Sequence, residues 1–258
     1  MTKHLISMAV ECLDKASTAY GMDISAEKTK LMTNNTSDIN TEIKVNGQKF
    51  ETVTSFKYLG SVITDEGSKP ELLCRIAQAT AALTRPKPIW IDKSISLSSK
   101  IRLMRSLVTS IFLYACESWT LTAELQRRIH AMEMRCYRKI LHISYKDHVT
   151  KEEFRAKTQQ AIGPHEDLPT IVKRHKLQWY GHVSRSSGLA ITILQGTVRE
   201  GRRPGRPRKR WEGNIRKWTR LEFAKSQRTV QNRGKWRKLV VKSSLVPHAQ
   251  RPSRLRDR

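Results

Sequence analysis

Six basic side chains lie within nine residues near the carboxyl-terminal third of the chain, in the stretch RRPGRPRKR. Guanidinium and ammonium groups attract phosphates without reading a base sequence. The proline and glycine residues among them favour an extended, solvated backbone that leaves these groups accessible. The stretch therefore indicates contact with a polyanion. Its basic residues are Arg202, Arg203, Arg206, Arg208, Lys209 and Arg210.

The charge of the whole chain supports the same chemistry. The 258 residues include 49 Lys and Arg against 23 Asp and Glu, a formal net charge of +26. From residue 199 onward there are 21 basic and 4 acidic residues, so +17 of that charge falls in the last 60 residues. Nucleic acid, either RNA or DNA, is the expected partner. A membrane surface is a weaker interpretation, because no strongly amphipathic basic helix is visible.

Cysteine and histidine residues do not form a recognisable metal site. Four cysteines stand singly, without a CxxC pair or a nearby histidine pair, so we expect buried, reduced thiols and no zinc. His130 and His182 are isolated and are assigned no chemistry. No secretory signal is visible, and the longest uncharged run is too short to span a bilayer. We expect a nuclear or cytoplasmic protein, with the nucleus favoured.

The first quarter of the chain contains all the expected strands. Apolar residues at helical spacing predict a helix over residues 2–19 that ends at Gly21, with Leu5, Ala9, Leu13, Ala16 and Tyr20 on its buried face. Asn46-Gly47 within residues 42–50 predicts a tight hairpin. The stretch FKYLGSVITDEGS, residues 56–68, predicts a second hairpin that turns at Leu-Gly and is stabilised by burial of Phe56, Tyr58 and Leu59.

The rest of the sequence predicts helices, so the expected fold class is α+β and predominantly α-helical. Capping-box patterns start helices at Ser68 and Thr150. The expected helix over 96–115 buries Leu97, Ile101, Met104, Val108 and Ile111. Further helices are expected over 122–142 and 168–184, followed by two short basic helices that tryptophans anchor. These tryptophans, with Trp179 before them, are Trp211, Trp218 and Trp236.

Five segments together resemble a known family. GMDISAEKTKLM and FKYLGSVIT resemble the late-palm segment and the following primer-grip hairpin of reverse transcriptases. SLVTSIFLYACESWTL, LQWYGHVSR and GRPRKRWEGNI are similar to segments of the carboxyl-terminal half of non-LTR, LINE-type retrotransposon endonuclease-reverse transcriptases. The resemblance covers roughly residues 3 to 245, in the order that the family has.

This resemblance implies roles for several residues. The hairpin would hold the primer 3′ end, through Phe56, Lys57, Tyr58, Leu59 and Gly60. Lys28 matches the family's late-palm lysine, a possible general acid toward pyrophosphate in a full-length enzyme. Ser25 stands where the family usually has asparagine.

The family's catalytic metal ligands have no counterpart in this sequence. RNA-directed DNA polymerases hold two Mg²⁺ ions with carboxylates that include an adjacent Asp-Asp pair. This chain has eight Asp residues, and no two are adjacent. Its first helix matches the segment just after that pair, so the sequence resembles a truncated family member. We expect no metal or other cofactor for this chain alone, and no catalytic residue.

The resemblance implies four regions. Residues 1–67 correspond to a palm remnant, 68–163 to a thumb-like helical bundle, 164–198 to a helical connection, and 199–258 to a basic nucleic-acid-binding region with a disordered tail. The expected function is that of a LINE reverse transcriptase fragment that retains template-primer binding surfaces. The alternatives are a non-enzymatic DNA- or RNA-binding protein of transposon origin, and a decayed open reading frame with no selected role.

The basic stretch also leaves alternatives open. Its GRP core resembles an AT-hook, whose arginines enter the narrow minor groove of A·T-rich DNA, although Pro204 replaces the usual arginine before Gly205. Minor-groove contact, non-specific phosphate contact and a nuclear import signal are the three interpretations.

Overall fold

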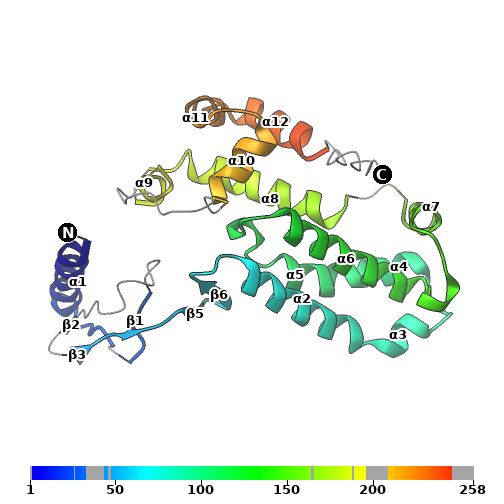
Figure 1. Ribbon diagram of the computed structural model, residues 1–258, viewed down its shortest axis with the longest axis horizontal. Helices are drawn as coiled ribbons and strands as arrows, with labels where there is room; N and C mark the ends of the chain where they lie inside the picture. The colour runs from blue at the N-terminus through cyan, green and yellow to red at the C-terminus, as the bar shows by residue number, and fades with distance from the viewer. Residues whose placement is uncertain are drawn as a thin grey trace, which may run out of the picture. The chain divides into compact units, whose positions relative to one another are not determined.

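The computed structural model describes residues 2–25, 27–32, 44–45, 48–163, 166–187, 189–195 and 209–245. The chain divides into two compact units, residues 1–71 and 72–258. The described part is mostly helical with a few short strands, as predicted (Figure 1).

Apart from the start of α2, the described residues of the first unit form one helix and three two-stranded sheets. Helix α1 spans Thr2–Ala19, and Gly21 follows it with a left-handed φ of 69°, which ends the helix where the sequence predicted. Strands β1 and β4 pair in parallel, β2 with β3 and β5 with β6 antiparallel. The strands are β1 (Lys30–Leu31), β2 (Lys44–Val45), β3 (Gln48–Lys49), β4 (Glu51–Thr52), β5 (Ser55–Tyr58) and β6 (Ser61–Thr64).

Both predicted hairpins form. Strands β2 and β3 flank Asn46-Gly47, which itself lies outside the described residues. In the second hairpin Tyr58 pairs with Ser61, so the connection has two residues, Leu59 and Gly60. Their φ angles of 47° and 85° are those of a type I′ turn, whose twist matches that of the strands. The side chain of Glu71 accepts hydrogen bonds from the Val62 backbone N–H (2.6 Å) and the Ser61 hydroxyl (3.2 Å).

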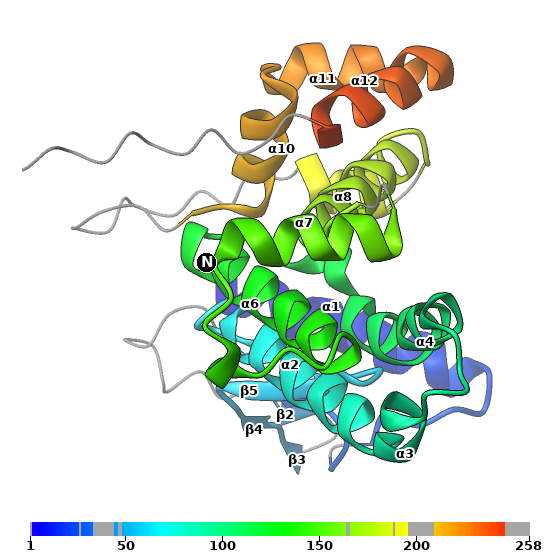
Figure 2. The ribbon, with the colours of Figure 1, turned by 90° about the vertical axis from the view of Figure 1, so that its right-hand side faces the viewer.

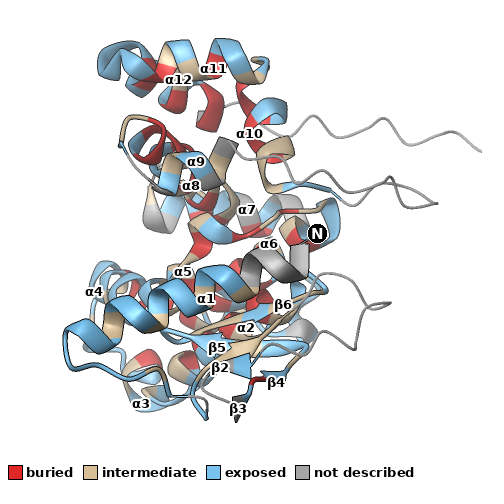
Figure 3. Ribbon diagram, turned by 90° about the vertical axis from the view of Figure 1, so that its left-hand side faces the viewer, coloured by how far each residue is buried: buried red, intermediate tan, exposed pale blue. Residues whose placement is uncertain are grey.

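The predicted burial in this unit is wrong at several positions. Tyr58 is 58% exposed and Leu59 is 73% exposed, so packing of these side chains does not stabilise the hairpin; Phe56 alone is half-buried. The expected apolar face of α1 is also exposed, as Leu13 and Tyr20 show, and Figure 3 draws most of that helix in pale blue. The small cluster of this unit instead centres on Phe50, against which Val10, Ile24 and Leu31 pack.

The second unit is a bundle of helices. Helix α2 begins in the first unit and continues here. The helices are α2 (Lys69–Thr84), α3 (Lys87–Ile91), α4 (Leu97–Met104), α5 (Ser110–Leu113), α6 (Ala123–Ile140), α7 (Lys151–Ile162), α8 (Leu168–Val183), α9 (Leu189–Gln195), α10 (Trp211–Thr219), α11 (Phe223–Gln231) and α12 (Arg233–Leu245). The 3₁₀ turns η2 (Cys116–Ser118) and η3 (Tyr145–Asp147) precede α6 and α7.

Local capping signals place several of these helices. The Thr150 hydroxyl accepts from the Glu153 N–H, and the Glu153 carboxylate accepts from the Thr150 N–H, which is the predicted capping box of α7. The Thr122 hydroxyl and the Asp167 carboxylate accept from the first turns of α6 and α8 in the same way.

The predicted helix over 96–115 is interrupted by a π-helical turn, η1 (Arg105–Thr109). A π turn contains one more residue than an α turn, so the buried stripe moves by one position. Phe112 is therefore fully buried, and Ile111, which was expected in the core, is only half-buried. The hydrophobic pattern alone could not locate that extra residue.

One hydrophobic cluster connects α2 through α12. Figures 1 and 2 show its layers: α2 to α6 lie on one side of α8, and α10 to α12 lie on the other. Helix α8 contacts α6, η2 and α12, so it is the central element of this unit. Two of the four cysteines, Cys116 and Cys136, are buried as expected; Cys12 is exposed and Cys74 half-buried, contrary to the prediction.

Candidate nucleic-acid interface

Helices α10, α11 and α12 present a surface of basic side chains, here called the C-terminal basic surface. Ten Lys and Arg residues on these helices or in their connections are exposed, and between residues 209 and 245 the sequence has only Glu212 and Glu222 as acidic residues. Within the described residues, none of these ten side chains forms an ion pair with a carboxylate. They are Arg216, Lys217, Arg220, Lys225, Arg228, Arg233, Lys235, Arg237, Lys238 and Lys242.

The spacing of apolar residues in α12 directs its basic residues outward. Trp236 and Val240 are buried, and Lys235, Lys238 and Lys242 are exposed. Residues three and four positions apart share a helix face, so the inward and outward sets lie on different faces of one helix. The positive charge thus sits on a folded, preorganised element.

Trp236 attaches α12 to α8. Its indole N–H donates to the Leu177 carbonyl oxygen at 3.1 Å, and its ring covers Gly181. A Cβ atom at position 181 would lie 2.2 Å from the Trp236 Nε1 atom. Only glycine therefore allows this approach without displacement of the indole ring.

Other residues of the LQWYGHVSR stretch also hold the carboxyl-terminal helices. The hydroxyl groups of Tyr180 and Ser226 are hydrogen-bonded at 2.8 Å, and the Arg185 guanidinium donates to the Val230 carbonyl at 3.2 Å. Trp179 is 40% exposed, and its ring packs edge-on against Trp211 with centroids 5.4 Å apart. Through these contacts the carboxyl-terminal half of α8 packs against the helices that carry the C-terminal basic surface.

A buried lysine lies where three of the motif-bearing segments meet. Lys176 in α8 is fully buried, and its Nζ atom donates to the Trp119 carbonyl (2.6 Å) and to the Asn214 side-chain oxygen (3.0 Å). Asn214 in α10 accepts from the Leu121 N–H and donates to the Leu121 carbonyl. The centroid of the Trp211 ring lies 4.4 Å from the Lys176 Nζ atom. This polar cluster fixes α10 against the segment before α6.

Burial dominates the ionisation of this lysine. Desolvation, reinforced by the nearby Lys209 charge, lowers the pKa of Lys176 to about 6. The neighbouring Cys116 thiol lies 3.7 Å from the His175 Nδ1 atom, and burial raises the pKa of Cys116 to about 12. Cys116 is therefore a protonated core residue at neutral pH rather than a nucleophile.

The structure describes two of the six basic residues of the RRPGRPRKR stretch. The Lys209 ammonium donates to the Leu121 carbonyl, and desolvation lowers the pKa of Lys209, although the residue as a whole is exposed. Arg210 is exposed at the start of α10. The others lie outside the described residues: Arg202, Arg203, Arg206 and Arg208.

The residues with roles implied by resemblance lie in the first unit. Lys28 is exposed in the turn before β1. Lys57, Tyr58, Leu59 and Gly60 form the exposed end of the β5–β6 hairpin. The exposed Tyr58 ring can stack on a base, and Lys57, on the opposite face of the strand, can contact a phosphate.

Sequence reasoning did not single out Lys176, Asn214 or Gly181. The partners of Asn214 are 38 and 93 residues away along the chain, and no local pattern indicates contacts of that range. The one available signal was indirect: all three residues fall in or beside stretches that resemble family motifs.

The described part of the chain contains neither a metal-binding cluster nor a membrane-spanning helix. No group of three or more His, Cys, Asp or Glu side chains there is arranged to hold a metal ion. No described helix is both long and apolar enough to cross a membrane.

Comparison with known proteins shows one relevant similarity. The chain is 26% identical over 221 residues to an uncharacterized transposon-derived protein of Caenorhabditis elegans, and the match covers 81% of this chain and 77% of that protein. No protein-family profile matches the chain. No solved structure matches it either. The relationship to a transposon-derived protein extends over most of the sequence and supports a transposon origin for this chain.

Proposed function

We propose that this chain is the carboxyl-terminal part of a LINE-type reverse transcriptase and binds nucleic acid, chiefly through phosphate contacts of the C-terminal basic surface. The observation that carries the proposal is the set of ten exposed basic side chains on α10–α12, which have no carboxylate partner among the described residues. Charges of one sign on rigid helices form a field that attracts a polyanion. The transposon-derived relative supports a transposon origin, the coarser part of this proposal.

The β5–β6 hairpin contributes a second contact in this proposal. Lys57 and Tyr58 are consecutive residues of β5 beside a two-residue turn, so their exposed side chains lie on opposite faces of the hairpin end. In the full-length family this hairpin would hold the primer terminus. Here it offers one positive charge and one aromatic face to a bound strand.

The proposal includes no polymerase activity for this chain alone. Without the adjacent Asp-Asp pair there is no carboxylate set to bind the two metal ions that phosphoryl transfer requires. Purified protein, given primed template, nucleotides and Mg²⁺ or Mn²⁺, should not extend the primer. Chelator-sensitive extension above a no-protein control would refute this part of the proposal.

Fluorescence anisotropy with a labelled 20-base-pair duplex tests the binding surface. The triple variant Lys235→Ala, Lys238→Ala, Lys242→Ala removes three charges from the outer face of α12 and leaves Trp236 and Val240 in place. Its affinity should fall at least tenfold at low salt, because phosphate contacts supply most of the non-specific binding free energy.

A charge-matched variant separates the surface from the overall charge. Lys93→Ala, Arg102→Ala, Arg127→Ala removes three exposed charges from elsewhere in the same unit. This control should lose less than threefold in affinity. Equal losses in the two triple variants would show that binding depends on net charge alone and would contradict the assignment of α12.

A further inference from the structure

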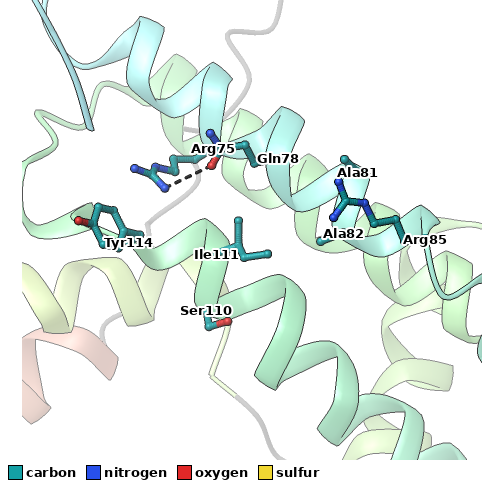
Figure 4. A pocket seen from close by; sticks show the side chains of 8 residues that line it. All are labelled: Arg75, Gln78, Ala81, Ala82, Arg85, Ser110, Ile111 and Tyr114. Atoms are coloured by element: carbon teal, nitrogen blue, oxygen red, sulfur yellow. Dashed lines mark hydrogen bonds between the residues drawn. The ribbon is translucent and has the colours of Figure 1, made fainter. Parts of the chain in front are cut away.

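A groove between α2 and α5 lies away from α10–α12 and carries one buried and one exposed arginine, Arg75 and Arg85. The groove has a volume of about 520 Å³, and Figure 4 shows the side chains that line it. No carboxylate is among them. They are Arg75, Gln78, Ala81, Ala82 and Arg85 from α2 and the residue after it, and Ser110, Ile111 and Tyr114 from α5 and the residue after it.

Helical spacing explains why these residues share the groove. Positions 75, 78, 82 and 85 are three or four residues apart, so they follow one face of α2. From Arg75 to Arg85 this face extends about 15 Å at the α-helical rise. On the opposite wall, the π-helical turn before α5 moves Ile111 out of the core and into the groove, where its side chain forms an apolar surface.

One end of the groove holds the buried Arg75 against an aromatic ring. The Arg75 guanidinium lies 4.4 Å from the centroid of the Tyr114 ring and donates to the Gln78 side-chain oxygen at 3.3 Å. Tyr114 is still 47% exposed. The chain turns directly after it, since Ala115 adopts a left-handed φ of 55°, and this turn separates Tyr114 from the 3₁₀ turn that follows.

We propose that this groove binds a single strand of nucleic acid, with a base against Tyr114 and Ile111 and the backbone phosphate near Arg85. Aromatic stacking requires an unpaired base, because both faces of a paired base are covered within a duplex. Arg85 is exposed at the other end of the groove and supplies the charge for the phosphate. The inference deepens the proposed function by adding a site for single strands to the duplex-binding surface.

The test compares a labelled ten-nucleotide oligothymidylate with the 20-base-pair duplex. Tyr114→Ala should weaken binding of the single strand about tenfold or more, because stacking on one aromatic contributes about 1–3 kcal/mol per base. Tyr114→Phe keeps the ring and should bind within twofold of the wild type. Duplex affinity should change less than twofold in both variants.

Arginine variants test the phosphate contact in the same assay. Arg85→Ala should weaken single-strand binding at least threefold at low salt, whereas Arg102→Ala removes an exposed arginine from α4, outside the groove, and should have no measurable effect. If Tyr114→Ala and Arg85→Ala bind the decamer as the wild type does, or if the wild type does not bind it, the groove assignment is wrong. The duplex results for α12 would then stand independently.

Photocrosslinking gives a readout that does not depend on affinity. A decamer with one 5-iodouracil should crosslink within the tryptic peptide that follows Arg105 and contains Ile111 and Tyr114. Crosslinks confined to peptides of α10–α12 would place the single strand on the C-terminal basic surface and would overturn the inference.

Discussion

Lys176 shows how one buried polar side chain can organise a polar core. It is fully buried, yet its Nζ atom donates to two acceptors, the Trp119 carbonyl and Asn214, and lies over the Trp211 ring. A buried polar group with partners specifies one arrangement of the elements that supply them. No sequence pattern predicts this cluster, because its members come together only when α8 and α10 pack against the segment before α6.

The lowered pKa of Lys176 leads to a pH-dependent stability. Between about pH 6 and the unfolded value near 10.4, the unfolded chain binds this proton and the native chain does not, so the free energy of unfolding rises with pH. The groups that face this lysine include Lys209 and the Cys116 thiol. The Cys116 thiol stays protonated between pH 6 and about 10. Relative to Lys176→Met, wild-type stability should increase by up to about 1.4 kcal/mol per pH unit. Urea unfolding of both proteins from pH 6.5 to 9 measures this difference; a constant difference would contradict the lowered pKa.

Gly181 gives a matched pair of glycine substitutions. The methyl group of Gly181→Ala would overlap the Trp236 indole ring, so we expect a loss of about 2 kcal/mol or more in the free energy of unfolding. Gly213→Ala, in α10, meets no atom within 4 Å and should be neutral or stabilising by up to about 1 kcal/mol. Denaturant unfolding of the two variants measures both changes in the free energy of unfolding. Equal changes would contradict the close contact between Gly181 and the Trp236 ring.

At the scale of elements, local signals predicted helices and turns well. The Thr150–Glu153 capping box, the end of α1 at Gly21 and the hairpin turn at Leu59-Gly60 each depend on a few neighbouring residues, and all three are confirmed. Burial depends on distant partners instead, so the predicted burial of Tyr58 and Leu13 is wrong.

The candidate binding sites were only partly predictable for the same reason. The composition indicated a basic carboxyl-terminal region. Which side chains of α12 point outward, however, depends on the buried contact of Trp236 with α8. The groove at Tyr114 depends on a π-helical turn that shifts Ile111 and Phe112 by one position. Neither consequence follows from a hydrophobic pattern read along one helix.

The β5–β6 hairpin carries a testable conformational strain. Leu59 has a φ of 47°, a left-handed conformation that is unfavourable for a side chain of this type, whereas asparagine tolerates it. Leu59→Asn should stabilise the hairpin by about 1 kcal/mol and slow amide hydrogen exchange within residues 55–64 about fivefold. Amides of α6 serve as the internal reference. Faster exchange in the hairpin would mean that the Leu59 side chain contributes contacts that outweigh the strain.

At the scale of the whole molecule, the helices that carry the C-terminal basic surface also belong to the hydrophobic core. The hydrophobic cluster of the second unit extends from Leu72 to Val240, so the carboxyl-terminal helices are part of its core. Removal of residues 199–258 would therefore expose apolar surface of α8 in addition to removing charge. Substitution of exposed lysines changes the charge alone, and for this reason it is the cleaner probe of nucleic-acid binding.

The salt dependence of duplex binding tests whether the C-terminal basic surface contacts the phosphates. Each neutralised phosphate contributes about −0.9 to the slope of log K against log salt concentration. We expect a steep wild-type slope, about −5 to −7 for six to eight contacts, and a slope shallower by about 2–3 in Lys235→Ala, Lys238→Ala, Lys242→Ala. The control Lys93→Ala, Arg102→Ala, Arg127→Ala should keep the wild-type slope. An unchanged slope in the α12 variant would contradict the claim that the C-terminal basic surface binds the phosphates.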